Sequence, residues 1–400
     1  MIARVLCTFS VLLMLISMVP AQERPLAILA GKVCVMDKNA TVLNNVVVLV
    51  SDGRIEKIIP ARGASIPDGY RVIDHSDKWV VPGLIDCHNH TAGALRELND
   101  GVWLTNPGLR TSDLLAPGTD NMKRALAGGV TTVLLIPGSG TNLSGFGTIA
   151  RTAGRTPQEM LMRGPGSLKI AQAGNPERYY FGVARSYMNF NLRQTLKKAQ
   201  AHAAKSDQGA PNATWDGFRG LFAKEFPVSV HTQIYQVFTK TLTMLHDEFG
   251  LWVMPDHSTF DSYKAAELVL ERDLHVIVGP RCFWMDPADR TINGCAARFW
   301  EAGVRKLGIN TDAPVVPEEN LTVQAAMAVR LGWETYPALA GLTRIPAEAL
   351  GVIDRIGTVE VGKDADICVW TGDPIDPRSS VELAVVQGRV AYEAKKERIY

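Results

Sequence analysis

Two histidines one residue apart follow an apolar run near residue 85. The segment 80–87 reads VVPGLIDC and leads directly into His88, Asn89 and His90. Because strand side chains alternate in direction, His88 and His90 should point the same way. Two neutral imidazoles at a strand end form half of a divalent metal site, and Zn²⁺ suits such nitrogen ligands. Histidine pairs also cap and pack without a metal, so the pair indicates a metallohydrolase only in company with further ligands.

Between about residues 80 and 356, apolar strand-like runs alternate with helical stretches, which is typical of a parallel sheet with crossover helices. The predicted strands are 80–87, 131–136, 147–151, 168–173, 228–231, 251–255, 275–278 and 304–310. The third of these has the weakest pattern. The segment 234–249 carries apolar residues at helical spacing and stops at Gly250, which predicts a helix. Eight strands in this arrangement predict an α/β fold, a (β/α)8 TIM barrel.

Four more polar residues lie in or just after predicted strands. They are Lys169, His231, His257 and Asp312. In a TIM barrel the carboxyl ends of all strands open on one face, so these side chains can meet the histidine pair. Each also has an ordinary interpretation. The two histidines could be hydrogen-bonded in the core, the aspartate could cap a helical turn, and the lysine could reach solvent from a strand edge.

The order of these residues resembles a known family pattern. The segment 81–90, VPGLIDCHNH, resembles the first barrel strand of the amidohydrolase superfamily, PGxIDxHxH. The four later residues match the ligand positions of the fourth, fifth, sixth and eighth strands, in that order. Segments 343–351 and 357–366 look like the family's closing helix and sandwich strand. Within the superfamily the chain looks most like imidazolonepropionase-like amidohydrolases and prolidase-type peptidases.

The resemblance implies a metal site and a hydrolytic reaction. Its expected ligands are His88, His90, Lys169, His231, His257 and Asp312. One or two divalent ions, expected to be Zn²⁺, would lower the pKa of a bound water and polarise a substrate carbonyl. Asp312 would act as general acid/base during hydrolysis of a non-aromatic C–N bond in an amide, dipeptide or cyclic amide. An unmodified lysine has no lone pair to donate, whereas in the family the lysine is often carboxylated, which would let Lys169 bridge two metals.

Two departures from the family pattern indicate altered substrate contacts. The chain has His231-Thr232-Gln233 where many relatives have His-Ala-His, and AGNP at 173–176 where they have Gly-Glu-Asn-Pro. Candidates for binding a substrate carboxylate, which a solvated helix start explains equally well, are Arg178, Tyr179, Tyr180, Arg185 and Tyr187. The Gly-, Ser- and Thr-rich segment 138–166 predicts either a loop over the barrel mouth or a plain solvated connection.

Both ends of the chain differ from the barrel segment 81–356. Residues 1–21 combine a lone Arg4, an apolar stretch and a Val-Pro-Ala ending, which predicts a secretory signal peptide and a secreted or periplasmic protein. The stretch is short for a membrane anchor, which needs about 20 apolar residues. Residues 22–80 and 357–400 carry short β-rich runs, and neither set alone buries enough apolar surface. They therefore predict one small β-sandwich built from both ends.

Composition narrows the class of partner. The chain has 42 basic and 41 acidic residues and a net charge of +1, which favours neither nucleic acid nor an anionic membrane. The expected partner is a small-molecule substrate, and the sequence leaves open whether the protein forms a homo-oligomer. The six cysteines show no CxxC spacing and predict neither a disulfide framework nor a thiolate zinc site. Cys87 should point away from His88 and pack in the core.

Two other classes of function remain compatible with the sequence. A catalytically silent barrel could bind a small molecule or partner, and its binding would survive a metal chelator. A deaminase or lactonase could use the same site, and release of ammonia would identify the former. The sequence does not specify the substrate, because specificity resides in loops carried by a common barrel.

Overall fold

The computed structural model describes residues 24–93, 98, 100–101, 103–172, 174–179, 183–205 and 209–399. The expected signal peptide, residues 1–21, lies outside them, and secretion stays a prediction. Within the described ranges, no helix combines the length and apolar character needed to cross a membrane.

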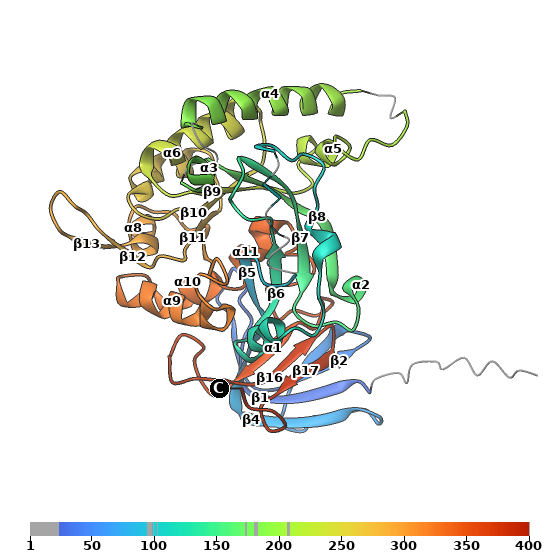
Figure 1. Ribbon diagram of the computed structural model, residues 1–400. Helices are drawn as coiled ribbons and strands as arrows, with labels where there is room; N and C mark the ends of the chain where they lie inside the picture. The colour runs from blue at the N-terminus through green and yellow to red at the C-terminus, as the bar shows by residue number, and fades with distance from the viewer. Residues whose placement is uncertain are drawn as a thin grey trace, which may run out of the picture.

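Eight strands surround the central core in a TIM-barrel-like α/β fold (Figure 1). They are β5 (Leu84–Asn89), β6 (Val130–Leu135), β7 (Leu143–Arg151), β8 (Leu161–Ala171), β9 (Val228–Thr232), β10 (Val253–His257), β11 (Val276–Val278) and β14 (Leu307–Ile309). One sheet has the order β10-β9-β8-β7-β6-β5, and β11 pairs with β14. Gly279 N donates to His257 O (2.9 Å) and His90 N to Ala313 O (3.0 Å), which links the two sheets into a nearly closed barrel.

The third strand corrects two expectations from the sequence. Strand β7 runs antiparallel to both β6 and β8, so the barrel does not consist of eight parallel strands. The segment 138–166, expected as a mouth loop or a solvated connection around the predicted strand 147–151, contains β7, the short helix α2 (Pro157–Met160) and the start of β8. Every residue of β7 is buried, so the strand has no alternation of polar and apolar residues to reveal it. Its small residues fit a tight space, since a Cβ on Gly147 would lie 2.6 Å from Ile136 Cγ2.

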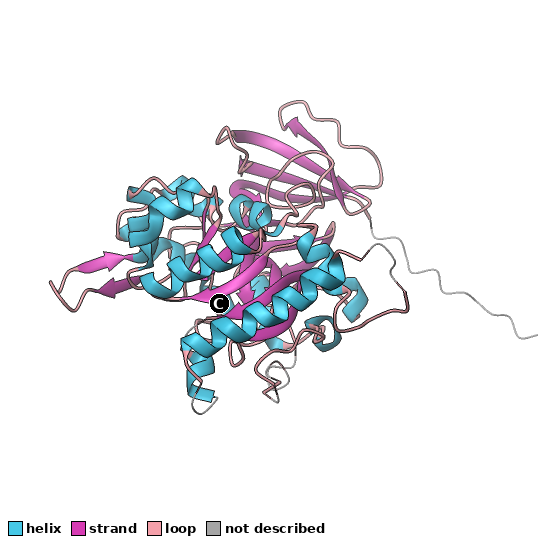
Figure 2. Ribbon diagram, turned by 90° about the horizontal axis from the view of Figure 1, so that it is seen from above, coloured by secondary structure: helices cyan, strands magenta, loops and turns pink. Residues whose placement is uncertain are grey.

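Helices pack around the barrel. Helix α4 lies across the end opposite the accessory sheet, which is the seven-stranded sheet formed by both ends of the chain (Figure 1). The longer ones are α1 (Asp120–Ala127), α4 (Arg185–Ala203), α6 (Tyr235–Thr241), α8 (Cys295–Glu301), α9 (Leu321–Arg330) and α11 (Arg344–Leu350). The shorter ones are α3 (Asn175–Tyr179), α5 (Gly217–Phe222), α7 (Ala266–Glu271), α10 (Thr335–Ala340) and the turns η2 (Thr111–Leu114), η4 (Ser262–Ala265) and η5 (Glu318–Asn320). The predicted helix 234–249 is confirmed as α6 followed by a π-helix, η3 (Leu242–Glu248). A hairpin of β12 (Phe283–Met285) and β13 (Ile292–Gly294) projects from the barrel (Figure 2).

A seven-stranded sheet combines both ends of the chain, as the sequence predicts. Its strands are β1 (Leu26–Cys34), β2 (Val42–Ser51), β3 (Arg54–Pro60), β4 (Arg71–Pro82), β15 (Ile367–Trp370), β16 (Val381–Val386) and β17 (Arg389–Glu393), in the order β17-β16-β15-β4-β1-β2-β3. Strand β4 pairs with β1 from the N-terminal part and with β15 from the C-terminal part. A separation into two sandwich layers and the domain boundaries 22–80, 81–356 and 357–400 stay predictions.

The accessory sheet fixes where the first barrel strand begins. Strand β4 ends at Pro82 and β5 begins at Leu84, so only Gly83 separates the two. Gly83 N donates to Asp366 O (2.8 Å), and a Cβ at this position would lie 2.0 Å from Thr131 Oγ1. The close approach requires glycine, because any side chain would push β5 away from β6. The position of the histidine pair five residues later depends on this junction.

Candidate metal centre and active site

The carboxyl ends of β9, β10, β11 and β14 border a cavity of about 700 Å³. His231, at the end of β9, and Asp312, just after β14, both line this cavity. A cavity at the carboxyl ends of the strands is where barrel enzymes place their chemistry. The residues beneath it form the candidate site.

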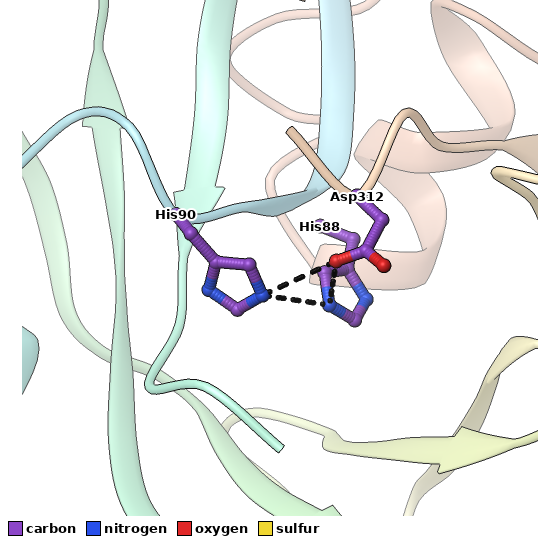
Figure 3. Close-up of side chains that lie close together, drawn as sticks. All are labelled: His88, His90 and Asp312. Carbon is purple, nitrogen blue, oxygen red and sulfur yellow. Dashed lines mark hydrogen bonds and ion pairs between the residues drawn. The ribbon is translucent and has the colours of Figure 1, made fainter. Parts of the chain in front are cut away.

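His88, on β5, and His90, directly after it, lie beside Asp312 (Figure 3). Their Nε2 atoms are 3.2 Å apart. Asp312 Oδ1 lies 3.2 Å from Nε2 of His88 and 3.3 Å from Nε2 of His90. These three side chains offer ligand atoms within 4.8 Å of one another. The prediction that the two histidines point the same way is confirmed.

Hydrogen bonds determine which ring nitrogen of two histidines faces the site. His90 Nδ1 lies 2.9 Å from Ile136 O, and His257 Nδ1 lies 2.8 Å from Gly279 O. A carbonyl only accepts, so Nδ1 carries the proton and Nε2 of the neutral ring presents a lone pair. Burial lowers the pKa of both rings, that of His257 to about 4. Both imidazoles are therefore neutral near pH 7.

His231 and His257 carry buried nitrogen atoms that lack hydrogen-bond partners. Both ring nitrogens of His231 and Nε2 of His257 are in this state. The two rings have centroids 4.1 Å apart, and the His257 centroid lies 4.4 Å from that of His88. Burial is the main cause that lowers the pKa of His231 well below its usual value, and the neighbouring His257 is the second. The alternative of hydrogen-bonded core histidines does not hold for His231.

Lys169, on β8, is fully buried beside the histidines. Its Nζ lies 3.3 Å from His88 Nε2. Burial lowers the pKa of Lys169 to about 8, although the Asp256 and Asp312 carboxylates oppose this shift. The interpretation of Lys169 as a strand-edge lysine that reaches solvent is wrong.

Asp312 adopts a backbone conformation that residues other than glycine seldom use. Its φ is +51°, and that of His257 is +62°. Such conformations cost on the order of 1–3 kcal/mol and gather at functional sites. Burial raises the pKa of Asp312, but the charge of His88 and a hydrogen bond from its ring hold it well below its usual range. An ionised carboxylate therefore faces the cavity.

Sequence reasoning missed Asp256, which orients His88. Its carboxylate accepts from His88 Nδ1 (2.6 Å), Asn310 Nδ2 (2.6 Å), Ser229 Oγ (3.0 Å) and the His257 amide (2.8 Å). Burial opposes a charge on His88, yet the Asp256 and Asp312 carboxylates raise its pKa to about 9. Carboxylate–histidine pairs of this kind fix the ligand nitrogen in metal sites. The available signal was an acidic residue inside a buried strand, since aspartate is seldom buried without partners.

Asp86 is a second residue whose role the sequence did not show. It accepts from the His88 amide (2.8 Å) and from both the amide (2.9 Å) and hydroxyl (2.5 Å) of Thr311. Burial raises the pKa of Asp86 to about 6. The pKa of the nearby buried Glu318 is also raised, mainly by burial and to a smaller extent by the charge of Asp86. Asp86 thereby ties the backbone of His88 to the residue that precedes Asp312.

Cys87 packs away from the site, as expected. It is fully buried in an apolar cluster that contains Ile85 and Met254, and burial raises the pKa of its thiol well above the usual value. A protonated, enclosed thiol is a poor nucleophile.

The donor set fits a divalent cation. The ring nitrogens of His88 and His90 converge with the Asp312 carboxylate, and within the described residues neither the His231 nitrogens nor His257 Nε2 has a hydrogen-bond partner. A buried acceptor left unpaired costs about 1–3 kcal/mol, and a cation would relieve several such costs together. Nitrogen and oxygen donors in this combination suit Zn²⁺ and related ions.

The six residues predicted as ligands are neighbours, and His88, His90 and Asp312 offer ligand atoms within 4.8 Å of one another. Of the five residues predicted to bind a carboxylate, the three whose side chains the structure describes do not line the cavity. Arg185 is paired with Glu177 at 3.3 Å, Tyr187 is exposed, and neither they nor Arg178 line the cavity. Tyr180 and the side chain of Tyr179 fall outside the described part of the chain.

A barrel whose strand ends gather four histidines, a lysine and an aspartate defines the class of TIM-barrel-like hydrolases. The model of the amidohydrolase family matches residues 294–395. The chain is 26% identical over 365 residues to an imidazolonepropionase of Rhizobium rhizogenes, covering 83% of this chain and 88% of that protein. It is 22% identical over 396 residues to amidohydrolase tasK of Hapsidospora irregularis, covering 86% of this chain and only 40% of tasK.

A solved structure shares the whole fold. The crystal structure of an amidohydrolase from Thermotoga maritima MSB8 has a TM-score of 0.82 and 27% identity, and the match covers 92% of this chain and 100% of that one. The chain is therefore similar to amidohydrolases over most of its length.

Proposed function

We propose that the protein is a metal-dependent hydrolase that cleaves a non-aromatic C–N bond in a small amide, dipeptide or cyclic amide. The observation that carries this proposal is the group of His88, His90 and Asp312, whose ligand atoms lie within 4.8 Å of one another at the barrel mouth. The similarity to imidazolonepropionases supports a substrate with a C–N bond.

The metal ligands in this proposal are the six residues predicted from the sequence. The histidines and Asp312 would hold one ion, expected to be Zn²⁺, and a carboxylated Lys169 would allow a second. When bound, the metal supplies Lewis-acid polarisation of a carbonyl and a lowered pKa of water. Asp256 keeps Nε2 of His88 turned toward the ion through its 2.6 Å hydrogen bond to Nδ1.

Asp312 serves as the proton carrier in this reaction. Its side chain is 16% exposed, so it contacts the cavity while its Oδ1 remains beside His88 and His90. An ionised carboxylate at this place can accept a proton from the attacking water and deliver it to the leaving nitrogen. The rigid position set by the Thr311 hydrogen bonds to Asp86 keeps the carboxylate aimed at the cavity.

Elemental analysis combined with a hydrolysis screen tests the proposal. The purified protein should contain at least one equivalent of transition metal and hydrolyse some N-acyl amino acids, dipeptides or cyclic amides. A chelator should abolish turnover, and added Zn²⁺ or Mn²⁺ should restore it. Substoichiometric metal without turnover after metal addition would exclude the enzyme. Ligand binding that survives chelation would instead indicate a silent barrel, and ammonia as product would indicate a deaminase.

Carboxylation of Lys169 is a separate part of the proposal. An unmodified ammonium 3.3 Å from His88 Nε2 would repel a cation bound there, whereas a carbamate would attract it. Native mass spectrometry in bicarbonate buffer should show the mass of one added CO₂ and binding of two metals. A protein that binds two metals without that mass would contradict this part.

We also propose that residues 1–21 are removed on secretion. Mass analysis of protein recovered from the periplasm or medium should then show a mature chain that begins at Gln22. A mature protein that retains these residues inside the cell would contradict it.

A further inference from the structure

The cavity at the barrel mouth has an unusual distribution of charge. Among the described residues that line it, Asp312 is the only acidic side chain and Arg281 the only lysine or arginine. Asp312 Oδ1 already contacts the histidines, at 3.2 Å from His88 Nε2 and 3.3 Å from His90 Nε2. Arg281 forms no ion pair with any residue of the described chain, and it is exposed to the cavity. The Arg281 guanidinium is therefore a positive charge at the cavity without an acidic partner among the described residues.

The position of Arg281 is fixed by its neighbours. Its guanidinium carbon lies 4.8 Å from the centroid of the Phe260 ring. Gln324 Nε2 donates to Pro280 O at 2.6 Å, which holds the backbone immediately before Arg281. Gly279 O accepts from His257 Nδ1 at 2.8 Å. The segment 279–281 therefore connects the candidate metal site to the guanidinium within three residues.

The wall beside Arg281 is apolar and open. Phe283, Val315 and Val323 line the cavity with exposed fractions of 46%, 66% and 45%. Exposed apolar side chains around a cavity favour a ligand that carries an apolar group of its own. The cavity thus offers three different surfaces, which are the polar site, an aliphatic and aromatic wall, and one guanidinium.

We propose that Arg281 binds the carboxylate of the substrate, and that the substrate is an N-acylated or peptide-linked amino acid with an apolar side chain. This rests on the proposed function, because it concerns the same site. A guanidinium pairs with a carboxylate through two parallel hydrogen bonds from its N–H edge. The stacking of Arg281 on Phe260 leaves this N–H edge free for a substrate. A single cation matches a single negative charge, whereas a phosphate dianion would leave one charge unpaired against the apolar wall.

Two variants and one pair of substrates test Arg281. Arg281→Gln removes the charge, and Arg305→Gln is the control, because Arg305 is also exposed and stacks on an aromatic ring, Trp300, at 3.9 Å but does not line the cavity. The substrates are N-acetyl-leucine and N-acetyl-leucinamide, which differ only in the terminal charge. Arg281→Gln should lower kcat/KM for the acid about 10- to 100-fold, mainly through KM, and leave that for the amide unchanged. Arg305→Gln should change neither.

Equal losses for acid and amide would show that Arg281 has a structural role and would overturn the proposal. An unchanged kcat/KM for the acid would overturn it too. Rescue by Arg281→Lys should be partial, because an ammonium keeps the charge but loses the two-point geometry.

Calorimetric binding of the same two compounds separates this proposal from the proposed function. If wild-type protein hydrolyses neither compound, the acid should still bind more tightly than the amide, and Arg281→Gln should abolish the difference. Absence of a difference in wild type would overturn the carboxylate site whether or not the protein proves to be a hydrolase.

Discussion

Two buried polar clusters lie at opposite ends of the barrel and differ in how their atoms are satisfied. The mouth cluster consists of the six candidate ligands His88, His90, Lys169, His231, His257 and Asp312. The junction cluster consists of Arg151, Arg355, Asp364 and Asp366, and joins the end of β7 to the chain leading into β15. Because β7 runs antiparallel to its neighbours, its last residue lies at the end remote from the mouth.

In the junction cluster each charge faces an opposite charge. Arg151 donates to Asp364 (2.5 Å) and to Asp366 (3.2 Å), and Arg355 donates to Asp364 (2.7 Å). The remaining oxygen of Asp366 accepts from the Gln387 amide at 2.6 Å. Arg54 adds a further ion pair to Asp364 at 3.7 Å, so both aspartates face arginines and the arrangement needs no ligand to complete it.

The mouth cluster has the opposite character. The Nε2 atoms of His88 and His90 lie 3.2 Å apart, buried nitrogens of His231 and His257 lack partners, and two residues have strained backbones. Buried polar groups in native proteins are nearly always paired. Burial of charge alone therefore does not distinguish the two clusters, whereas the unpaired ring nitrogens of His231 and His257 occur only in the mouth cluster. Four variants test that distinction.

Replacement of Asp312 by Asn should have the largest effect. The amide cannot carry a proton between water and leaving group, so kcat should fall about 10²- to 10⁴-fold while the protein remains folded. Steady-state rates on a substrate from the hydrolysis screen, with circular dichroism as the folding control, measure this. Retention of activity within a few-fold would remove Asp312 from the proposed mechanism.

Arg151→Met should destabilise the fold and spare the chemistry. It leaves Asp364 and Asp366 buried beside fewer cations, a change that typically costs about 3–5 kcal/mol. Denaturant unfolding measures the loss, and activity per folded molecule should match wild type. Arg378→Met is the matched control, since Arg378 forms a 2.6 Å ion pair with Asp376 but is 89% exposed. Similar unfolding curves for the two variants would contradict the structural role of the junction cluster.

Asp256→Asn should weaken metal binding without removing a ligand. Loss of the carboxylate on His88 Nδ1 typically lowers metal affinity about 10- to 100-fold. Competition with a coloured chelator gives the affinity. Asp247→Asn, which changes a surface aspartate paired with Arg272, should leave it unaltered. An unchanged affinity in Asp256→Asn would show that Asp256 does not support the ion.

Glu348→Gln should have the smallest effect, and only in acid. Burial opposes the charge of Glu348, but hydrogen bonds from His275 and Arg344 lower its pKa from 4.5 to about 2. A pKa depressed in the folded state stabilises the protein above pH 4.5, and this contribution is lost as the pH falls toward 2. Removal of the carboxyl should therefore flatten the acid side of the stability profile by about 1 kcal/mol. Thermal unfolding midpoints of wild type and Glu348→Gln measured across this pH range test the prediction. The same pH dependence in both proteins would contradict it.

Local patterns in the sequence determined the parts of the protein that depend on neighbouring residues. The alternation at residues 84–90 gave the shared direction of His88 and His90, and the helical spacing at 234–249 gave α6 and η3. The ordered ligand residues were found through their resemblance to a family pattern. The β-rich runs at both ends likewise indicated one shared sheet, because neither could bury its apolar face alone.

Only the tertiary structure decided which polar residues meet. Strand β7 runs antiparallel to its neighbour β6, and because both of its faces are buried, its sequence has no alternation that could predict it. Asp256 and Asp86 lie inside strands, and only the fold places their carboxylates in hydrogen-bonding contact with His88. It also replaced Arg178 and Arg185 with Arg281 as the arginine of the cavity. Contacts between residues far apart in the chain depend on how strands close into a barrel, and no local periodicity records that closure.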